Sequence, residues 1–207
     1  LNLIKNNQFD TIYHEHYSYL SLTSVCNIFK FNGLSVFDVE KISTHGGSLR
    51  IYAQRSDIES RGVSERVIDL QKEEDGAGIG SIKLYQGFQE KVEDIKLKFL
   101  SFLIKAKNDK LSVVGYGAAA KGNTLMNFSG VRSDLLAYVI DKSSAKQDKF
   151  MPGSRVPIMN EVQLKKDKPD YIVIFPWNIQ NEIMDQLAYV KEWGGKFVIF
   201  IPSMQVI

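Results

Sequence analysis

The chain has 207 residues, of which 44% are hydrophobic and 24% are charged. This composition is typical of a globular protein with one sizeable core or two small ones, and it excludes disorder and a fibrous fold. The formal net charge of +2, from 26 basic and 24 acidic residues, is too small and too evenly spread to indicate a nucleic-acid or membrane surface, so the expected partner is a small molecule.

The single cysteine and the short apolar runs limit the protein class further. Cys26 has no second thiol to pair with and no ligand spacing around it, so neither a disulfide nor a thiolate metal site is expected. No apolar run approaches the ~20 residues of a membrane-spanning helix. No signal peptide is visible, and we predict a cytoplasmic protein. Because the sequence opens with Leu1 rather than Met, we expect it to be part of a longer polypeptide.

Hydrophobic periodicity divides the chain into three expected domains or blocks, at residues 1–55, 56–110 and 111–207. In the first block, Ser21 or Thr23 can cap a helix that ends at Gly33. The sequences LSVFDVEKI and SLRIYAQR then alternate apolar and polar residues, which predicts two antiparallel strands joined by STHGG. The first block is therefore expected to be a helix followed by a hairpin.

The second block is charged and is interrupted by the glycine-rich sequence DGAGIGS. Beyond it, apolar residues recur at intervals of three and four, at Leu84, Phe88, Val92, Ile95, Phe99 and Phe102. This spacing predicts a long amphipathic connecting helix. We expect its apolar stripe to pack as core rather than to bind a partner.

The third block alternates strands and helices. Strands are predicted at 111–117, 135–141, 156–158, 170–178 and 196–202, and helices at 118–128, 160–165 and 179–193. Such an order is typical of an α/β fold, here a doubly wound, Rossmann-like three-layer domain with a parallel sheet.

A strand–glycine–helix element, VVGYGAAAKGNT, begins this third block. Gly115 and Gly117 can admit an anion to the start of the helix, and Lys121 can add a positive charge. The alternative is close packing of strand against helix, because the spacing matches neither the dinucleotide nor the NTPase fingerprint. The broken fingerprint also disfavours a nicotinamide oxidoreductase. Asp141 ends the next strand as a ribose-binding acid or as a turn former.

Two of the three histidines lie in the sequence Tyr13-His14-Glu15-His16-Tyr17. A histidine beside a carboxylate suits a general base near neutral pH. A metal site would need a third ligand from elsewhere, and an inert surface loop is the remaining interpretation. The third histidine, His45, is expected in a turn or as a polar wall of a pocket.

Five segments together resemble bacterial S-adenosylmethionine-dependent sugar C-methyltransferases, which methylate C-3 of a nucleotide-linked 4-keto-deoxysugar. The segments are FDTIYHEHYSY, THGGSLRIY, GYGAAAKGNT, DKSSAKQDKFMPGSRVPI and PDYIVIFPWN. The resemblance implies that residues 1–55 are the helix–hairpin end of a methyltransferase domain and that a Rossmann-like domain follows. It also implies that the loop binding S-adenosylmethionine and the family's zinc-binding region lie outside this chain, which would be inactive alone.

The resemblance assigns roles to individual residues. It implies that His16 is the general base, that Glu15 orients it and that Tyr13 hydrogen-bonds the sugar or its oxyanion. Candidates for the nucleotide-sugar side are His14, Gly115, Gly117, Lys121, Asn123, Trp177 and Asn178. No metal is expected at the reacting centre. The alternative function is a Rossmann-like module that binds a nucleotide or another anion without catalysis.

Overall fold

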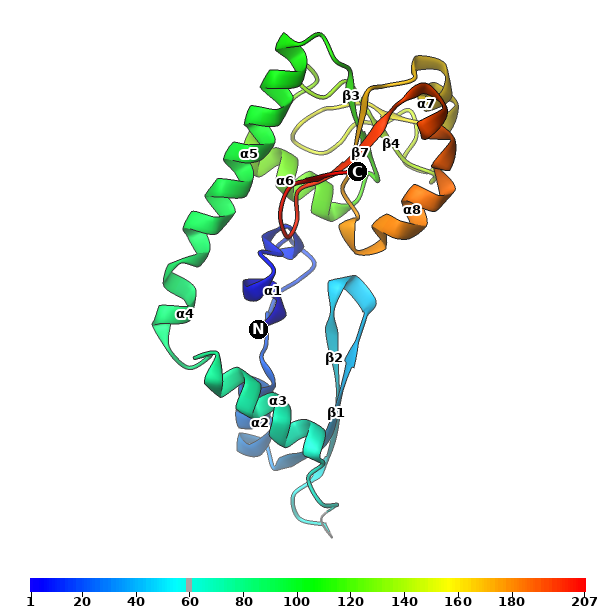
Figure 1. Ribbon diagram of the computed structural model, residues 1–207. Coiled ribbons are helices and arrows are strands. Elements are labelled where there is room, and N and C mark those ends of the chain that lie inside the picture. The colour runs from blue at the N-terminus through cyan, green and yellow to red at the C-terminus, as the bar shows by residue number, and fades with distance from the viewer. Residues whose placement is uncertain (59–60) are drawn as a thin grey trace. The chain divides into compact units, whose positions relative to one another are not determined.

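A computed structural model describes residues 1–58 and 61–207, which form two compact units (Figure 1). The first unit contains residues 1–5 and 17–89, and the second contains residues 6–16 and 90–207. The histidine segment up to His16 therefore folds with the C-terminal part of the chain. The expected division into three blocks stays a prediction.

The first unit is a helical layer with a two-stranded hairpin. It contains helices α1 (Asn2–Lys5), α2 (Leu22–Phe31), α3 (Glu65–Gly76) and α4 (Ile82–Gln86), and strands β1 (Leu34–Ile42) and β2 (Ser48–Arg55). The predicted cap is confirmed, because the hydroxyl of Ser21 accepts the N–H of Ser24 at 3.0 Å. Gly33 ends α2 with a φ of 73°, and β1 pairs antiparallel with β2 as predicted. His45 lies in the hairpin turn with a φ of 56°.

Helix α3 was not predicted from the sequence. Its buried positions are Val67, Leu70 and Glu74, and Ser64 caps it by accepting the N–H of Val67. The third buried position is thus a glutamate, and a glutamate in a sequence is normally expected to face the solvent. The apolar stripe is reduced to two residues, and for this reason periodicity did not detect the helix.

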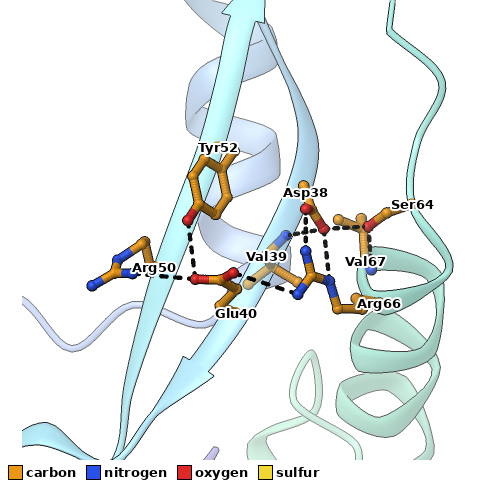
Figure 2. Close-up of polar contacts among 8 residues, drawn as sticks. All are labelled: Asp38, Val39, Glu40, Arg50, Tyr52, Ser64, Arg66 and Val67. Carbon is orange, nitrogen blue, oxygen red and sulfur yellow. Dashed lines mark hydrogen bonds and ion pairs between the residues drawn. The ribbon is translucent and has the colours of Figure 1, made fainter.

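A polar network joins the hairpin to the start of α3 (Figure 2). Asp38 on β1 accepts the hydroxyl of Ser64 at 2.6 Å and Nε of Arg66 at 3.0 Å. The Arg66 guanidinium, followed by the Ser64 hydroxyl, lowers the pKa of Asp38 to about 2. Glu40 on the same strand accepts the hydroxyl of Tyr52 from β2 at 3.0 Å. These partly solvent-exposed bonds orient the hairpin rather than supply much stability.

The second unit is built on a six-stranded sheet in the order β5-β4-β3-β6-β7-β8. The strands are β3 (Val113–Tyr116), β4 (Val139–Ile140), β5 (Ile158–Met159), β6 (Tyr171–Ile174), β7 (Lys196–Ile199) and β8 (Gln205–Val206). The first five strands of this order pair in parallel, which confirms the Rossmann-like α/β fold. The sixth strand, β8, was not predicted and pairs antiparallel with β7.

Helices flank both faces of this sheet, with α5 and α6 on one side and α7 and α8 on the other (Figure 1). Their bounds are α5 (Phe88–Asn108), α6 (Ala120–Ser129), α7 (Glu161–Asp167) and α8 (Gln180–Gln186), with short 3-10 helices η1 (Phe9–Thr11), η3 (Trp177–Ile179) and η4 (Ala188–Trp193). The long helix begins at Phe88 and not at Leu84, which lies in α4. The helix predicted at 179–193 is divided at Leu187.

No helix in residues 1–58 or 61–207 is long and apolar enough to cross a membrane.

A buried carboxylate joins the two main helices of the first unit. Glu74 on α3 is 1% exposed. Its oxygens accept the N–H groups of Leu22 and Thr23 at 2.8 Å each and the hydroxyl of Thr23 at 2.6 Å. The carboxylate therefore satisfies N–H groups at the start of α2 that have no partner within the helix. Of the two residues predicted as possible caps, Ser21 caps the helix, whereas Thr23 donates hydrogen bonds to Glu74.

We predict that Glu74→Gln lowers the free energy of unfolding by on the order of 2 kcal/mol, because the amide places a donor against buried N–H groups. The matched control is Glu73→Gln, since Glu73 pairs with Lys5 and Lys41 at the surface. That change should cost about 1 kcal/mol or less. Urea unfolding followed by circular dichroism measures both, and equal effects of the two variants would contradict the buried role of Glu74.

Candidate active site

The segment that carries the histidines is held in a compact conformation within the second unit. Phe9 is buried, and its ring packs edge-on against Phe128 of α6 with 5.4 Å between centroids. The Thr11 hydroxyl donates to the carbonyl of Gln8 at 2.7 Å, and the N–H of His16 donates to the carbonyl of Tyr13 at 2.9 Å. These contacts attach the segment to α6 and define its local path.

His16 is half-buried, and its ring orientation is set by the backbone. Its Nδ1 lies 2.8 Å from the carbonyl oxygen of Thr11. A carbonyl can only accept a hydrogen bond, so Nδ1 carries the proton and the neutral ring has its lone pair on Nε2. The ring of Tyr13 lies 4.2 Å away between centroids. This arrangement is chemically suited to a base that acts through Nε2.

The two residues between Tyr13 and His16 are exposed. Nε2 of His14 lies 3.8 Å from a carboxylate oxygen of Glu15, and the two side chains are 85% and 71% exposed. Nδ1 of His16 donates the orienting hydrogen bond to the carbonyl of Thr11, a contact that the sequence did not reveal because the acceptor is a backbone atom. The expected orienting role of Glu15 and the substrate role of His14 stay predictions.

Three candidates for the substrate side come together at the carboxyl end of β6. Lys121 on α6 is only 7% exposed. Its Nζ lies 4.0 Å from the ring centroid of Trp177 and donates to Oδ1 of Asn178 at 2.7 Å. Burial lowers the pKa of the Lys121 ammonium, and the charge of Asp10 opposes this shift. The cluster thus holds a partly desolvated cation on an aromatic ring.

Asp10 completes this cluster and was missed by the sequence analysis. It lies in η1, is 1% exposed, and accepts the indole N–H of Trp177 through Oδ2 at 2.8 Å. Its other oxygen is buried without a hydrogen-bond partner. Burial raises the pKa of Asp10 to about 6, against smaller opposing effects of Trp177 and Lys121. In sequence, Asp10 is typical of a turn, and only its place in the FDTIYHEHYSY motif marks it.

The glycines of the VVGYGAAAKGNT element are accounted for by packing. A Cβ on Gly115 or Gly122 would lie 2.5 Å or 2.6 Å from the ring of Phe175, and one on Gly117 would lie 2.4 Å from Pro176. Gly117 also has a φ of 90°. The alternative of close strand–helix packing therefore explains these residues, and an anion contact at Gly115 and Gly117 stays a prediction.

The loop before α6 already holds a carboxylate. Asp141 accepts the N–H of Ala118 at 2.8 Å and that of Ser143 at 2.9 Å, and Nζ of Lys146 lies 3.2 Å from it. The turn interpretation of Asp141 thus accounts for its contacts. On α6 itself, Oδ1 of Asn123 is buried without a hydrogen-bond partner, so this amide can still accept a bond.

Metal chemistry finds no support in the residues that the structure describes. Across 1–58 and 61–207, no three His, Cys, Asp or Glu side chains gather so that they could hold a metal ion. The zinc of the resembling family therefore does not fit this part of the chain. What the described groups can supply is a base at His16 and a cation, an aromatic face and amide groups around Lys121.

Comparison with known proteins supports the resemblance seen in the sequence. Residues 43–202 match a family model described as the C-methyltransferase C-terminal domain. The chain is 36% identical over 207 residues to C-methyltransferase NovU of Streptomyces niveus. The match covers all of this chain and 49% of that protein, so the chain spans about half the length of this relative.

We predict that Asp10→Asn changes the pH dependence of stability. The pKa of Asp10 rises from 3.8 to about 6 on folding, so between these values the folded state binds more protons than the unfolded state. The contribution of Asp10 to the free energy of unfolding is therefore lost as the pH rises from 3.8 to about 6. From pH 4 to 7, wild type should lose on the order of 2 kcal/mol relative to the variant. Urea unfolding at several pH values tests this, and a constant difference would contradict it.

Proposed function

Because the chain belongs to the family of C-methyltransferase C-terminal domains, we propose that it forms the substrate side of an enzyme that methylates a carbon of a nucleotide-linked 4-keto-deoxysugar. The observation that carries this proposal is the 2.8 Å bond between Nδ1 of His16 and the carbonyl of Thr11. It makes Nε2 the basic nitrogen of a half-buried ring, as proton abstraction requires.

In the proposed reaction, Nε2 of His16 removes a proton from the carbon beside the ketone. The electron pair of that C–H bond moves toward the carbonyl, and an enolate forms. Tyr13, whose ring lies 4.2 Å from that of His16, is proposed to donate a hydrogen bond to the developing oxyanion. The bond to Thr11 holds the imidazole in place and stabilises the imidazolium that results.

S-adenosylmethionine, when bound, supplies the methyl group that the enolate attacks. None of the residues named above is assigned to this cofactor, which we propose is bound by another part of the complete enzyme. The zinc of the resembling family is likewise proposed to lie outside this chain. The contribution of this chain is to abstract the proton and to hold the acceptor.

The acceptor's nucleotide part is proposed to bind at the cluster around Lys121. The ammonium can bind a phosphate, and a partly buried charge interacts more strongly with an anion than one in water. Asn178 and Asn123 offer amide groups for hydroxyls or the base, and Trp177 offers a flat ring. This chemistry supports a ligand that combines a phosphate with a sugar.

We predict that His16→Gly in the complete enzyme lowers kcat about 10²- to 10⁴-fold, because a general base is lost. Binding of the nucleotide sugar, measured by calorimetry, should remain, since His16 is not assigned to the nucleotide. Transfer of a labelled methyl group from S-adenosylmethionine to several 4-keto sugar nucleotides gives kcat. Added imidazole should restore part of the rate. Undiminished transfer by this variant would refute the role of His16.

We predict that Lys121→Met weakens nucleotide-sugar binding at least about tenfold, because methionine keeps the apolar stem and removes the charge. The control is Lys107→Met, since Lys107 is exposed on α5 and bonds the carbonyl of Asp134. Calorimetric titration compares the two. Loss of binding in Lys121→Met, together with full function of His16→Gly, would favour the alternative of a non-catalytic nucleotide-binding module.

A further inference from the structure

We propose that Asp10 is a positioning residue for the nucleotide side of this site, an inference that rests on the function proposed above. Its carboxylate holds the indole of Trp177, and through this ring it places the ammonium of Lys121 beside Asn178. Asp10 thus joins the segment that carries His16 to the groups proposed to bind the substrate's phosphates.

The first step of the argument is that Asp10 itself is firmly placed. It lies in η1 between Phe9, which packs against Phe128, and Thr11, whose hydroxyl bonds the carbonyl of Gln8. The Asp10 side chain is 1% exposed. A buried carboxylate in such surroundings cannot turn to water, so its direction is set by its donor. Besides backbone N–H groups of its own turn, at Asp10 and Thr11, the donor is the indole N–H of Trp177, 2.8 Å from Oδ2.

The second step follows the contacts outward from Trp177. The face of the indole lies 4.0 Å from Nζ of Lys121, and the same Nζ donates to Asn178 at 2.7 Å. Trp177 and Asn178 are neighbours in η3, so the turn presents a ring face and an amide to one ammonium. Rotation of the indole would remove the ring from the ammonium. The hydrogen bond from Trp177 to Asp10 opposes that rotation.

The third step concerns charge. Among the described residues, the charged group that acts on the Asp10 carboxyl from another element is the ammonium of Lys121 on α6. Trp177 in η3 contributes an N–H donor, and on the same segment the titratable ring of His16 is bonded to the carbonyl of Thr11. A carboxylate binds the indole N–H more strongly than a neutral carboxyl does. Protonation near pH 6 should therefore loosen Trp177.

Trp177 provides a direct measurement, because the chain has two tryptophans and the other is Trp193. In a Trp193→Phe background, the fluorescence of Trp177 should change with a midpoint about pH 6 as Asp10 titrates. The same titration in Asp10→Asn should be flat. A transition that persists unchanged in Asp10→Asn would overturn the proposal, as would the lack of any transition in the Asp10 protein.

The effect on binding can be measured with thymidine diphosphate and uridine diphosphate as probes. At pH 7.5, Asp10→Asn should bind the preferred probe about tenfold more weakly, as expected for loss of about 1.4 kcal/mol. Trp177→Phe removes the N–H donor while it keeps an aromatic ring, and it should cause a similar loss. The double variant should bind no more weakly than the weaker single variant, because one change weakens and the other removes the same bond. Additive losses would refute the shared contact.

The experiment separates this inference from the function on which it rests. If neither diphosphate binds wild type while the titration of Trp177 still depends on Asp10, the proposed nucleotide ligand fails and the positioning of Trp177 by Asp10 stands. If a diphosphate binds wild type and Asp10→Asn equally well, the positioning role fails and the nucleotide ligand stands. In the complete enzyme, Asp10→Asn should raise KM with little change in kcat, which a general loss of folded protein would not do.

Discussion

The second unit depends most on how closely α6 approaches the sheet beside Phe175. Cβ atoms at Gly115 on β3, Gly117 in the loop and Gly122 on α6 would each lie within 2.6 Å of Phe175 or Pro176, so this close packing is possible only because these side chains are absent. This close approach brings Lys121, the residue before Gly122, next to the turn that follows Phe175 and Pro176. The cluster with Trp177 and Asn178 is thus a consequence of backbone packing.

The distribution of carboxylates explains why the cation, rather than the glycine loop, is the better candidate for anion binding. Asp141 accepts the N–H of Ala118 just before α6, the N–H of Ser143 after β4, and the ammonium of Lys146, so a negative charge of the protein itself occupies the loop. Asp10 accepts the indole N–H of Trp177 through Oδ2, and its Oδ1 is buried without a hydrogen-bond partner. Lys121 is itself buried, and the loss of water around its ammonium strengthens the electrostatic interaction with an anion.

Two buried acidic residues, Glu74 and Asp10, hold together elements that are far apart in the sequence. Glu74 holds the start of α2 in the first unit, and Asp10 holds Trp177 in the second unit. Both were difficult to identify in the sequence, because acidic residues are usually exposed and the exceptions depend on donors distant in the chain. For Glu74 the donors are 51 and 52 residues away, and for Asp10 the donor is 167 residues away.

The sequence alone determined helix α2 with a cap at Ser21 or Thr23, the hairpin, and the alternating strands and helices of the Rossmann-like sheet, because these depend on local periodicity, turn residues and capping. Its motifs also indicated the family. It did not determine the separation of α4 from α5, and it missed helix α3 and strand β8, whose stability comes from tertiary contacts rather than from their own pattern. Only the tertiary structure brought Asp10 to Trp177 and showed that the carbonyl of Thr11 orients His16. Contacts between distant residues, or with a backbone atom, leave no periodic signal in the sequence.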